Sequence, residues 1–576
     1  MAILLTRLAR VELARSFVRE VKNVIDSDTN KLYDYYNFAL ARTTAWTDEQ
    51  SPETAYDSQK YINQFRNNML FTQKVNPSDV CNLIRRIDWV SGTIYDAYDD
   101  DYSVNNPAPS AGATTLADAN FYVYTSTNRV YKCIDNRVNG VVVESTDEPA
   151  LTSTDIFETD DKYRWKFMYQ LSEADQNKFL DSEYIPVRKL TTDSPSYGTL
   201  VGEVKSITVT NGGSGYTSAP TVYIQGDGTG AAASVDPTKI VAGVIQPDAI
   251  TIDTVNGETF EGLGYTFAFV QFEGGGGTGA EAIVTLGDAD PENTVLQKAV
   301  ENAAIEGTIE RIIVQDGGRD YVAGDTFVKI TGDSVLSTDQ AVATVTIAEG
   351  SGSITGIDVT DVGANYNYAD ITFVDSNGDE IHTAEDDLVK KATARAIISP
   401  IHGHGSNPVR ELFSTTVGIV SSLSDNTNRD LMVDNDFRQI GLMKNIYDYD
   451  EQNIWREATA TTCFIANVNS SASYAIDDII VTDEGAADEG RFRVIQIVES
   501  TVTEGTFDIY LQSIVPNIKN ASVLKNVTQD ISSLTINSYT DPEISTAYGE
   551  VIYIENRTSI ARSSDQVETI KAIVQF

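Results

Sequence analysis

Two histidines are separated by a single residue in the segment SPIHGHGSNP, residues 399–408 of a 576-residue chain. In an extended strand, His402 and His404 would point to the same side and supply half of a metal site. No third ligand stands at a recognisable spacing, since the remaining histidine, His382, belongs to the acidic run IHTAEDD. A site needs a complete set of ligands, and the interleaved glycines permit positive φ. We therefore interpret the segment as a turn with hydrogen-bonded histidines and assign no metal ligand.

Carboxylates are densest in the run DAYDDDYS, residues 96–103, where Asp99, Asp100 and Asp101 are consecutive. A pair of carboxylates could perform the acid and base steps of glycoside cleavage. Successive side chains of such a run diverge, so we predict a solvated acidic loop. The sequence also contains no Gx[ST]xG elbow and no HExxH motif, which removes the usual signatures of nucleophilic and zinc hydrolysis. We expect no enzymatic activity and assign no catalytic residue.

Glycine-rich segments raise the possibility of calcium or phosphate binding. GGSGY, residues 212–216, resembles the start of a calcium-binding nonapeptide, but Tyr216 stands where an aspartate is required and the nine-residue period is absent. GDGTGA, residues 226–231, and GGGGTGA, residues 274–280, lack the GK[ST] ending of a phosphate loop and lie between expected strands. We interpret both as tight hairpins and expect no cofactor.

Cys133, Cys463 and one aromatic segment are interpreted as core. Cys81, Cys133 and Cys463 fit no zinc spacing and are too few for a disulfide framework, which favours synthesis in a reducing compartment. In KYRWKFMYQL, residues 162–171, aromatic side chains alternate with Arg, Lys and Met. This alternation predicts a strand that is buried on one face and half-exposed on the other. The alternative for these rings is a platform on which sugars stack.

Charge excludes several functions. Acidic residues outnumber basic ones 84 to 42, giving a formal net charge of -42, which repels nucleic-acid phosphates and anionic membranes. Calcium sites, a salty environment and basic partner surfaces all remain compatible with this imbalance. The N-terminal apolar run is interrupted by arginines, and no later segment has the apolar length of a membrane span. We expect neither a secretion signal nor membrane insertion.

Composition predicts a mainly β protein, because 28 Tyr and 39 Gly stand against five Met and four Trp. Between residues 201 and 396, self-similar segments align on four tyrosines whose positions differ by 49, 56 and 45 residues. Each segment predicts a strand, a glycine turn, a second strand opened by the tyrosine, a hairpin and a third strand. We expect four β repeats that pack on one another. The tyrosines are Tyr216, Tyr265, Tyr321 and Tyr366.

The sequence on either side is less regular and more aromatic. LYDYYNFALART, residues 32–43, has helical spacing, and NPSDVCNLIRRIDW offers Asn76 or Ser78 as a helix cap. NFYVYTSTNRVYKCIDN and residues 460–576 predict strands and turns. We predict that residues 1–200 and 397–576 are two halves of one body, interrupted by the inserted block 201–396.

Four strings in the outer segments carry a resemblance to a known family. They are IRRIDWVSGTIYDAYDD (84–100), the segment 131–171 from YKCIDNRVNG to KFMYQL, SPIHGHGSNPVREL (399–412) with NDFRQIGLMKNI (435–446), and GEVIYIENRTSIARSSDQVETIKAIVQF (549–576). In this order they resemble the dimeric baseplate wedge subunit, usually numbered eight, of contractile-tailed bacteriophages. The resemblance covers about 380 residues and leaves the block 201–396 uncovered.

That resemblance implies a β-sandwich type body with a little N-terminal helix and no catalytic activity. It also implies self-association, most simply as a homodimer, docking to other wedge and tail proteins, assembly in the bacterial cytoplasm, and a final location in the virion. The alternative is a tail-associated protein that binds or degrades host glycans through the repeats. A third possibility, a secreted adhesin, is disfavoured because the N-terminus carries no signal.

Overall fold

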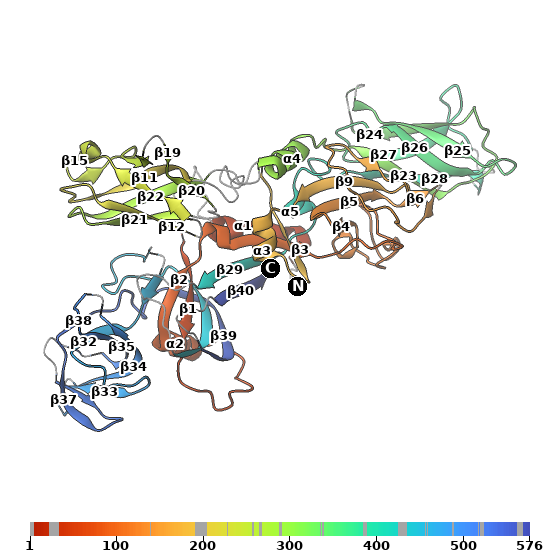
Figure 1. Cartoon of the computed structure of the whole chain (residues 1–576). Coiled ribbons are helices and arrows are strands. Elements are labelled where there is room, and N and C mark those ends of the chain that lie inside the picture. Colours follow the sequence, from red (N-terminus) through yellow and green to blue (C-terminus); the bar gives the residue numbers. More distant parts are fainter. Residues whose placement is uncertain are drawn as a thin grey trace. The chain divides into compact units, whose positions relative to one another are not determined.

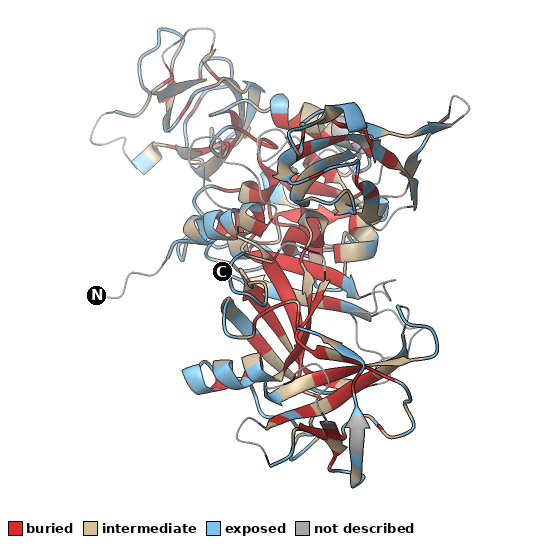
Figure 2. Cartoon of the chain, turned by 90° about the vertical axis from the view of Figure 1, so that its left-hand side faces the viewer, coloured by how far each residue is buried: buried red, intermediate tan, exposed pale blue. Residues whose placement is uncertain are grey.

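The computed structural model of the chain (Figure 1) describes most of the sequence. The described residues are 5–21, 34–138, 140–190, 204–226, 229–255, 258–263, 268–286, 291–334, 336, 339–383, 389–423, 435–455, 457, 459–485, 489–500, 502–516, 518, 523–561 and 568–576. The fold is mainly β, with 44% strand and 11% helix. This confirms the class predicted from the high Tyr and Gly content. Buried residues, red in Figure 2, follow the strands, whereas the helices carry exposed faces.

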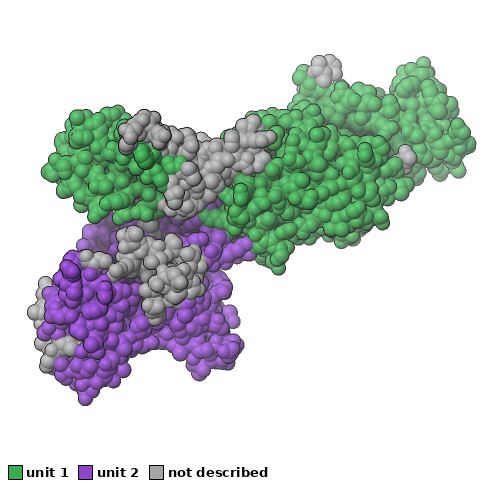
Figure 3. All heavy atoms as spheres, viewed as in Figure 1, with its two compact units in different colours: residues 1–16, 81–418, 574–576 green, residues 17–80, 419–573 purple. Residues whose placement is uncertain are grey.

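The chain divides into two compact units (Figure 3). Unit 1 contains residues 1–16, 81–418 and 574–576, and unit 2 contains residues 17–80 and 419–573. Both predicted boundaries, after residues 200 and 396, fall inside unit 1. The three-part division therefore stays a prediction.

In unit 2, one five-stranded sheet combines segments from both ends of the sequence. Its central strand β1 pairs with β2 on one side and with β30 on the other. All six residues of β1 are buried, so the predicted helix at residues 32–43 is wrong: a short apolar run suits a fully buried strand as well as a helix face. The strands, in sheet order, are β31 (Thr459–Thr461), β2 (Met69–Lys74), β1 (Tyr36–Ala41), β30 (Asp436–Lys444) and β39 (Glu550–Ala561).

A glycine determines how the helix α2 (Gln59–Asn68) packs on this sheet. A Cβ built on Gly441 would lie 2.2 Å from the Phe65 ring, which is fully buried. A larger residue in β30 would thus displace the helix. The second sheet of unit 2 is seven-stranded and has its own apolar core around Phe464 and Phe492. Its strands, in sheet order, are β37 (Ile531–Thr535), β36 (Val523–Asn526), β33 (Ile479–Thr482), β34 (Gly490–Glu499), β35 (Phe507–Val515), β32 (Phe464–Val468) and β38 (Ser538–Thr540).

The predicted helix cap at residues 76–78 closes only a single 3₁₀ turn. Asn76 and Asp79 form a reciprocal capping box around the turn Pro77–Asp79. The chain then enters the buried strand β3 (Val80–Arg85), which pairs with β10 (Tyr184–Val187). The expectation of a helix in this apolar run is therefore wrong. Two further strands, β29 (Thr416–Leu423) and β40 (Glu568–Gln575), belong to the second half of the sequence.

An aromatic sheet forms the centre of unit 1. It contains the predicted strands around residues 121–135 and 162–171, which are thereby confirmed. β9 is buried on both faces, so the expectation of a half-exposed face is wrong, and the interpretation of its rings as core is confirmed. The helix α4 (Pro291–Asn302) contributes Leu296 and Val300 to the same core. The strands, in sheet order, are β4 (Tyr122–Tyr124), β5 (Arg129–Asp135), β9 (Arg164–Gln170) and β8 (Phe157–Glu158).

Residues 204–286 and 309–398 each form a module with nested strand pairing. In the first, β11 (Val204–Ser214) pairs with the last strand β22 (Thr278–Leu286), and β12 (Thr221–Gly226) pairs with β21 (Ala268–Glu273). In the second, the outer pair is β23 with β28 and the inner pair is β24 with β27. The second module's strands are β23 (Ile309–Asp316), β24 (Phe327–Gly332), β25 (Val342–Ile347), β26 (Ile354–Asp361), β27 (Ala369–Val374) and β28 (Thr393–Ile398).

Shorter strands and helices complete the described chain. In the 204–286 module these include β14 (Ala233–Val235) and β17 (Ile250–Ile252), which extend the β12–β21 pair into a four-stranded sheet. The remaining helices are α1 (Arg7–Val21), α3 (Glu173–Phe179) and α5 (Pro408–Glu411). Within the described residues, no helix combines the length and apolarity needed to cross a bilayer.

Three of the four tyrosine segments share one local conformation. In each, an Asn or Asp side chain accepts the N–H of a glycine two residues later at 2.9–3.1 Å, and that glycine has positive φ. The residue before the tyrosine also has positive φ, and the tyrosine is buried. The segments are Asn211 to Tyr216, Asp316 to Tyr321 and Asp361 to Tyr366. Tyr265 lies outside the described residues, so an array of four equal repeats stays a prediction.

Substituting Gly318 by alanine should destabilise this turn, because the backbone approaches the glycine closely. Gly318 has a φ of 56°, and a Cβ there would lie 2.3 Å from the Lys390 carbonyl oxygen. Gly378 has a φ of 85° but open space around it. We expect Gly378→Ala to cost about 1 kcal/mol from backbone strain alone, and Gly318→Ala to cost at least about 3 kcal/mol because backbone must also move. Hydrogen exchange of the 309–398 module measures both; equal costs would contradict the close approach.

Candidate functional site at the acidic segment

The acidic segment between β3 and β4 is an ordered part of the unit 1 core. Asp96 is fully buried and accepts N–H groups of Ser110, Ala111 and Asn120 at 2.6–3.2 Å. These three bonds satisfy backbone donors that would otherwise be orphaned and fix the loop on both sides. Asp99 is also buried. The prediction of a solvated acidic loop is therefore wrong for both residues.

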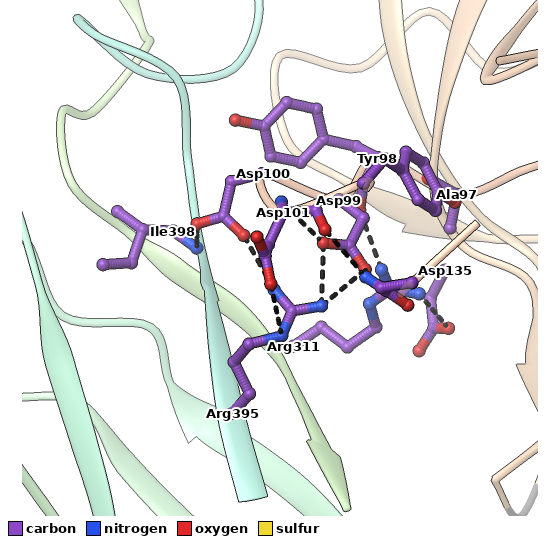
Figure 4. A network of polar contacts seen from close by, with 11 residues as sticks. Ala97, Tyr98, Asp99, Asp100, Asp101, Asp135, Arg311, Arg395 and Ile398 are labelled. Carbon is purple, nitrogen blue, oxygen red and sulfur yellow. Dashed lines mark hydrogen bonds and ion pairs between the residues drawn. The ribbon is translucent and has the colours of Figure 1, made fainter. Parts of the chain in front are cut away.

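Arg395 of β28 binds two carboxylates of this segment (Figure 4). Its Nη2 donates to both oxygens of Asp99 at 2.8 and 2.7 Å, and its Nη1 donates to Asp100 at 3.0 Å. The Ile398 N–H donates to the other Asp100 oxygen at 3.2 Å. A planar guanidinium suits this task because its donors are fixed in a fork. Strand β28 thereby binds two consecutive aspartates through Arg395 and the Ile398 N–H.

The pKa values of these aspartates respond differently to the same arginine. Burial opposes ionisation of Asp99, but the hydrogen bonds and charge of Arg395 outweigh it and hold the pKa below its ordinary value. For Asp100, burial outweighs the Ile398 N–H and Arg395, so the pKa is raised. Asp99 is thus ionised and paired at neutral pH and cannot serve as a general acid. Asp99 and Arg395 therefore form a structural ion pair that connects the acidic segment to β28.

Two further arginines connect the 309–398 module to the aromatic sheet. Arg311 of β23 donates to the Tyr98 carbonyl oxygen at 2.8 Å and approaches the Asp135 carboxylate at 3.4 Å. Arg164 of β9 donates to the carbonyl and carboxylate oxygens of Glu310 at 2.8 and 3.2 Å. Most of the Arg311 side chain is buried. These contacts and those of Arg395 together define what we call the arginine joint.

A second buried charge centre lies under the HGHG segment. The Glu411 carboxylate, at the end of α5, accepts the Lys132 ammonium and the N–H groups of Gly405 and Asn407 at 2.9–3.0 Å. Both members of the pair are buried. In the β5–β9 register, Lys132 lies directly opposite Lys166, which is also buried. Burial lowers the pKa of Lys132 and, together with the charge of Lys132, that of Lys166.

The two histidines of HGHG enter different environments. His404 is buried and lies edge-on to the Tyr98 ring at 4.8 Å between centroids. His402 is exposed, has a φ of 71°, and places Nδ1 3.4 Å from the Glu306 carboxylate. The segment forms a turn, as predicted, but the expectation of hydrogen-bonded histidines is wrong for the buried Nδ1 of His404, which has no hydrogen-bond partner in the described part of the chain. Among the described residues, no group of three or more His, Cys, Asp or Glu side chains could hold a metal ion.

Stability should fall as pH drops below about 6.5, because His404 is held neutral. Burial, and then the charges of Lys132 and Lys166, place the His404 pKa well below its ordinary 6.5. The unfolded chain therefore binds a proton that the folded chain does not. Lowering the pH from 6.5 to 5.5 should reduce the free energy of unfolding by up to about 1.4 kcal/mol. His404→Gln should flatten this dependence in denaturant titrations, while His402→Gln should leave it unchanged. An unchanged slope in His404→Gln would contradict the assignment.

Several residues of these centres were missed from the sequence. Lys132 and Lys166 each stand in a strand whose neighbours are apolar, and a charged residue in such a run is a signal of a buried pair. Arg395 and Glu411 gave no local signal. The three cysteines are free and buried. Burial raises the pKa values of Cys133 and Cys463, the latter to about 12, so their interpretation as core residues is confirmed.

No family model and no curated protein matches this sequence.

Proposed function

We propose that the protein is a structural component of the baseplate wedge of a contractile phage tail. It acts through self-association and through docking to other wedge and tail proteins, it is assembled in the host cytoplasm, and it is carried in the virion. The proposal starts from the four strings that resemble the dimeric wedge subunit. It involves no catalytic step, no cofactor and no nucleic acid, in keeping with the net charge of -42.

The convergence of these strings supports the proposal more than any other observation. Tyr98 from string 84–100, Lys132 from string 131–171, and His404 and Glu411 from string 399–412 meet in the buried charge centre of unit 1. In unit 2, β30 from the NDFRQIGLMKNI string pairs along its length with β39 from the last string. The resembling residues therefore contact one another inside a scaffold. Residues that share a fold, and not a catalytic pocket, are what a common architectural role requires.

The contacts of the buried carboxylates also support a structural role. The two most buried acidic residues of the 96–101 run bind backbone N–H groups or Arg395, and Glu411 is committed to Lys132. A group that is fully hydrogen-bonded inside the fold has no free lone pair or proton for a substrate. Function then lies on the surfaces, through interfaces whose free energies differ between two states of the assembly.

Two measurements test the proposal. Light scattering coupled to gel filtration of the whole chain should give a homodimer, and an electron-microscopy map of the particle should place the chain in the baseplate wedge. A monomer at about 10 μM, well above the dissociation constant of a stable homodimer, together with absence from the wedge density, would refute the assignment.

A host-glycan protein is the second candidate function. The exposed Tyr223 on a sheet of the 204–286 module favours the binding form of this candidate over the degrading form. Release of reducing sugar that one Asp→Asn change abolishes would establish the degrading form and overturn the structural proposal.

A further inference from the structure

The four-stranded sheet β17-β14-β12-β21 has one face in the module core and one face exposed. Val222, Ile224, Val270 and Phe272 point into the core. Because side chains alternate along a strand, the residues between them point outward. The outward residues are Thr251, Ser234, Thr221, Tyr223, Gln225, Phe269, Gln271 and Glu273. We call this set the outer face.

Two aromatic residues occupy diagonal positions on the outer face. Tyr223 pairs with Gln271, and the neighbouring pair joins Gln225 to Phe269, so Tyr223 and Phe269 are diagonal neighbours on adjacent strands. Diagonal positions on one face are about 7 Å apart, within reach of each other's rings. Tyr223 is 44% exposed. Glu273, at the other diagonal position, raises the pKa of Tyr223.

Among the described residues of the outer face, the polar groups are almost all uncharged. The eight residues of the outer face supply hydroxyl groups, two carboxamides and a single carboxylate, that of Glu273, and none of them is lysine or arginine. This is unusual on a chain with a net charge of -42. Gln and Asn carboxamides both donate and accept hydrogen bonds, as do hydroxyls, so they match a ligand that carries many neutral hydroxyl groups.

The 309–398 module shows what the equivalent surface looks like without these features. There the inner pair β24–β27 also exposes an aromatic ring, Phe327, which is 47% exposed. Lys329, two residues along the strand, and Asp370, opposite Thr331, point outward on the same face of the pair. Of these two described sheet faces, only that of the 204–286 module therefore has mainly neutral polar residues around its aromatic side chains. Phe327 provides a matched control ring.

We propose that the outer face binds a neutral glycan, with a sugar ring stacked on Tyr223 and Phe269 and its hydroxyl groups hydrogen-bonded to Gln225, Gln271 and Thr221. An aromatic ring offers a flat apolar surface to the C–H face of a sugar, and the carboxamides on either side fix its orientation. The absence of cations on the outer face disfavours acidic polysaccharides and nucleic acids. This proposal does not rest on the assembly role, since a wedge component and a free protein could both carry such a surface.

Binding of the whole chain to immobilised bacterial surface polysaccharides tests the proposal. The panel contains neutral polysaccharides and polysaccharides rich in uronic acids, and interferometry measures affinity at about 50 and about 500 mM NaCl, where screening of exposed charges differs strongly. We expect binding to at least one neutral polysaccharide, with an affinity that changes less than about twofold between the two salt concentrations. Tyr223→Ala should weaken it about tenfold, and Tyr223→Phe, which keeps the ring, should retain most of it.

Controls separate this result from misfolding and from self-association. Phe327→Ala should bind as the unaltered chain does, and Tyr223→Ala should keep the same melting temperature because its side chain is exposed. Failure to bind any neutral polysaccharide, or binding that Tyr223→Ala leaves unchanged, would overturn the proposal. Tyr223→Ala converting a dimer to a monomer would also overturn it, because the outer face would then be an interface between copies. A dimer that persists without glycan binding would overturn this proposal and leave the assembly proposal intact.

Discussion

Replacing Arg395 by alanine is expected to destabilise the attachment of the 309–398 module by about 3 kcal/mol. Its guanidinium binds both oxygens of Asp99 and one oxygen of Asp100, and the Asp99 side chain is 4% exposed. Without Arg395 the buried Asp99 carboxylate keeps only uncharged donors, the Asp101 N–H at 2.9 Å and the Asn106 carboxamide at 3.4 Å. Removing one partner of a buried pair costs more than the pair contributes, because the remaining charge loses its compensation.

Hydrogen exchange measured by mass spectrometry suits this prediction, because it reports the local opening of the segments that Arg395 connects. Peptides covering residues 93–101 and 393–398 should exchange faster in Arg395→Ala. The Asp99→Asn change should have a smaller effect, since its carboxamide oxygen still accepts from Arg395. Lys391→Ala is the matched control: its ion pair with Glu380 is more than a third exposed on both sides, so the expected loss is below about 1 kcal/mol. Equal protection in Arg395→Ala and the unaltered chain would mean that the joint does not hold the module.

The sequence indicated local features well where local residues decide them. HGHG forms a turn because two glycines adopt positive φ there, at Gly403 and Gly405, and glycine is the residue that allows this. The predicted glycine turns form in three of the tyrosine segments, where an Asn or Asp two residues before the glycine accepts its N–H. The mainly β class followed from composition. None of these predictions needed a partner far along the chain.

The predictions failed where the deciding partner is far away in sequence. Asp99 looked solvated because its neighbours are acidic, but Arg395, 296 positions later, neutralises it. The apolar run in β1 matched a helix, yet it lies between β2 and β30, and the second of these comes some 400 positions later. Strand pairing between distant segments overrides local periodicity. A single sequence contains no signal for such pairings.

The buried charge centre should respond very differently to the loss of each partner. Glu411→Gln is expected to cost about 4 kcal/mol, because it leaves the buried Lys132 ammonium without a counter-charge and opposite Lys166. Lys132→Met should cost less than about 2 kcal/mol. In that variant the Glu411 carboxylate keeps the N–H groups of Gly405 and Asn407, and methionine fills most of the space of the lysine stem.

The stability of Glu411→Gln should increase with pH, which simple misfolding of the variant would not produce. Burial already lowers the Lys132 pKa in the presence of Glu411, and removal of the carboxylate lowers it further. Folded Lys132 is then neutral over a range in which the unfolded chain still binds its proton, so stability rises with pH by up to about 1.4 kcal/mol per unit until the ordinary lysine pKa is reached. Denaturant titrations between pH 7 and 9 should therefore show Glu411→Gln recovering part of its loss, while the double variant Lys132→Met with Glu411→Gln shows no such recovery. A loss in Glu411→Gln that stays constant with pH, or one no larger than that of Lys132→Met, would show that the cation is not held in a buried, compensated pair.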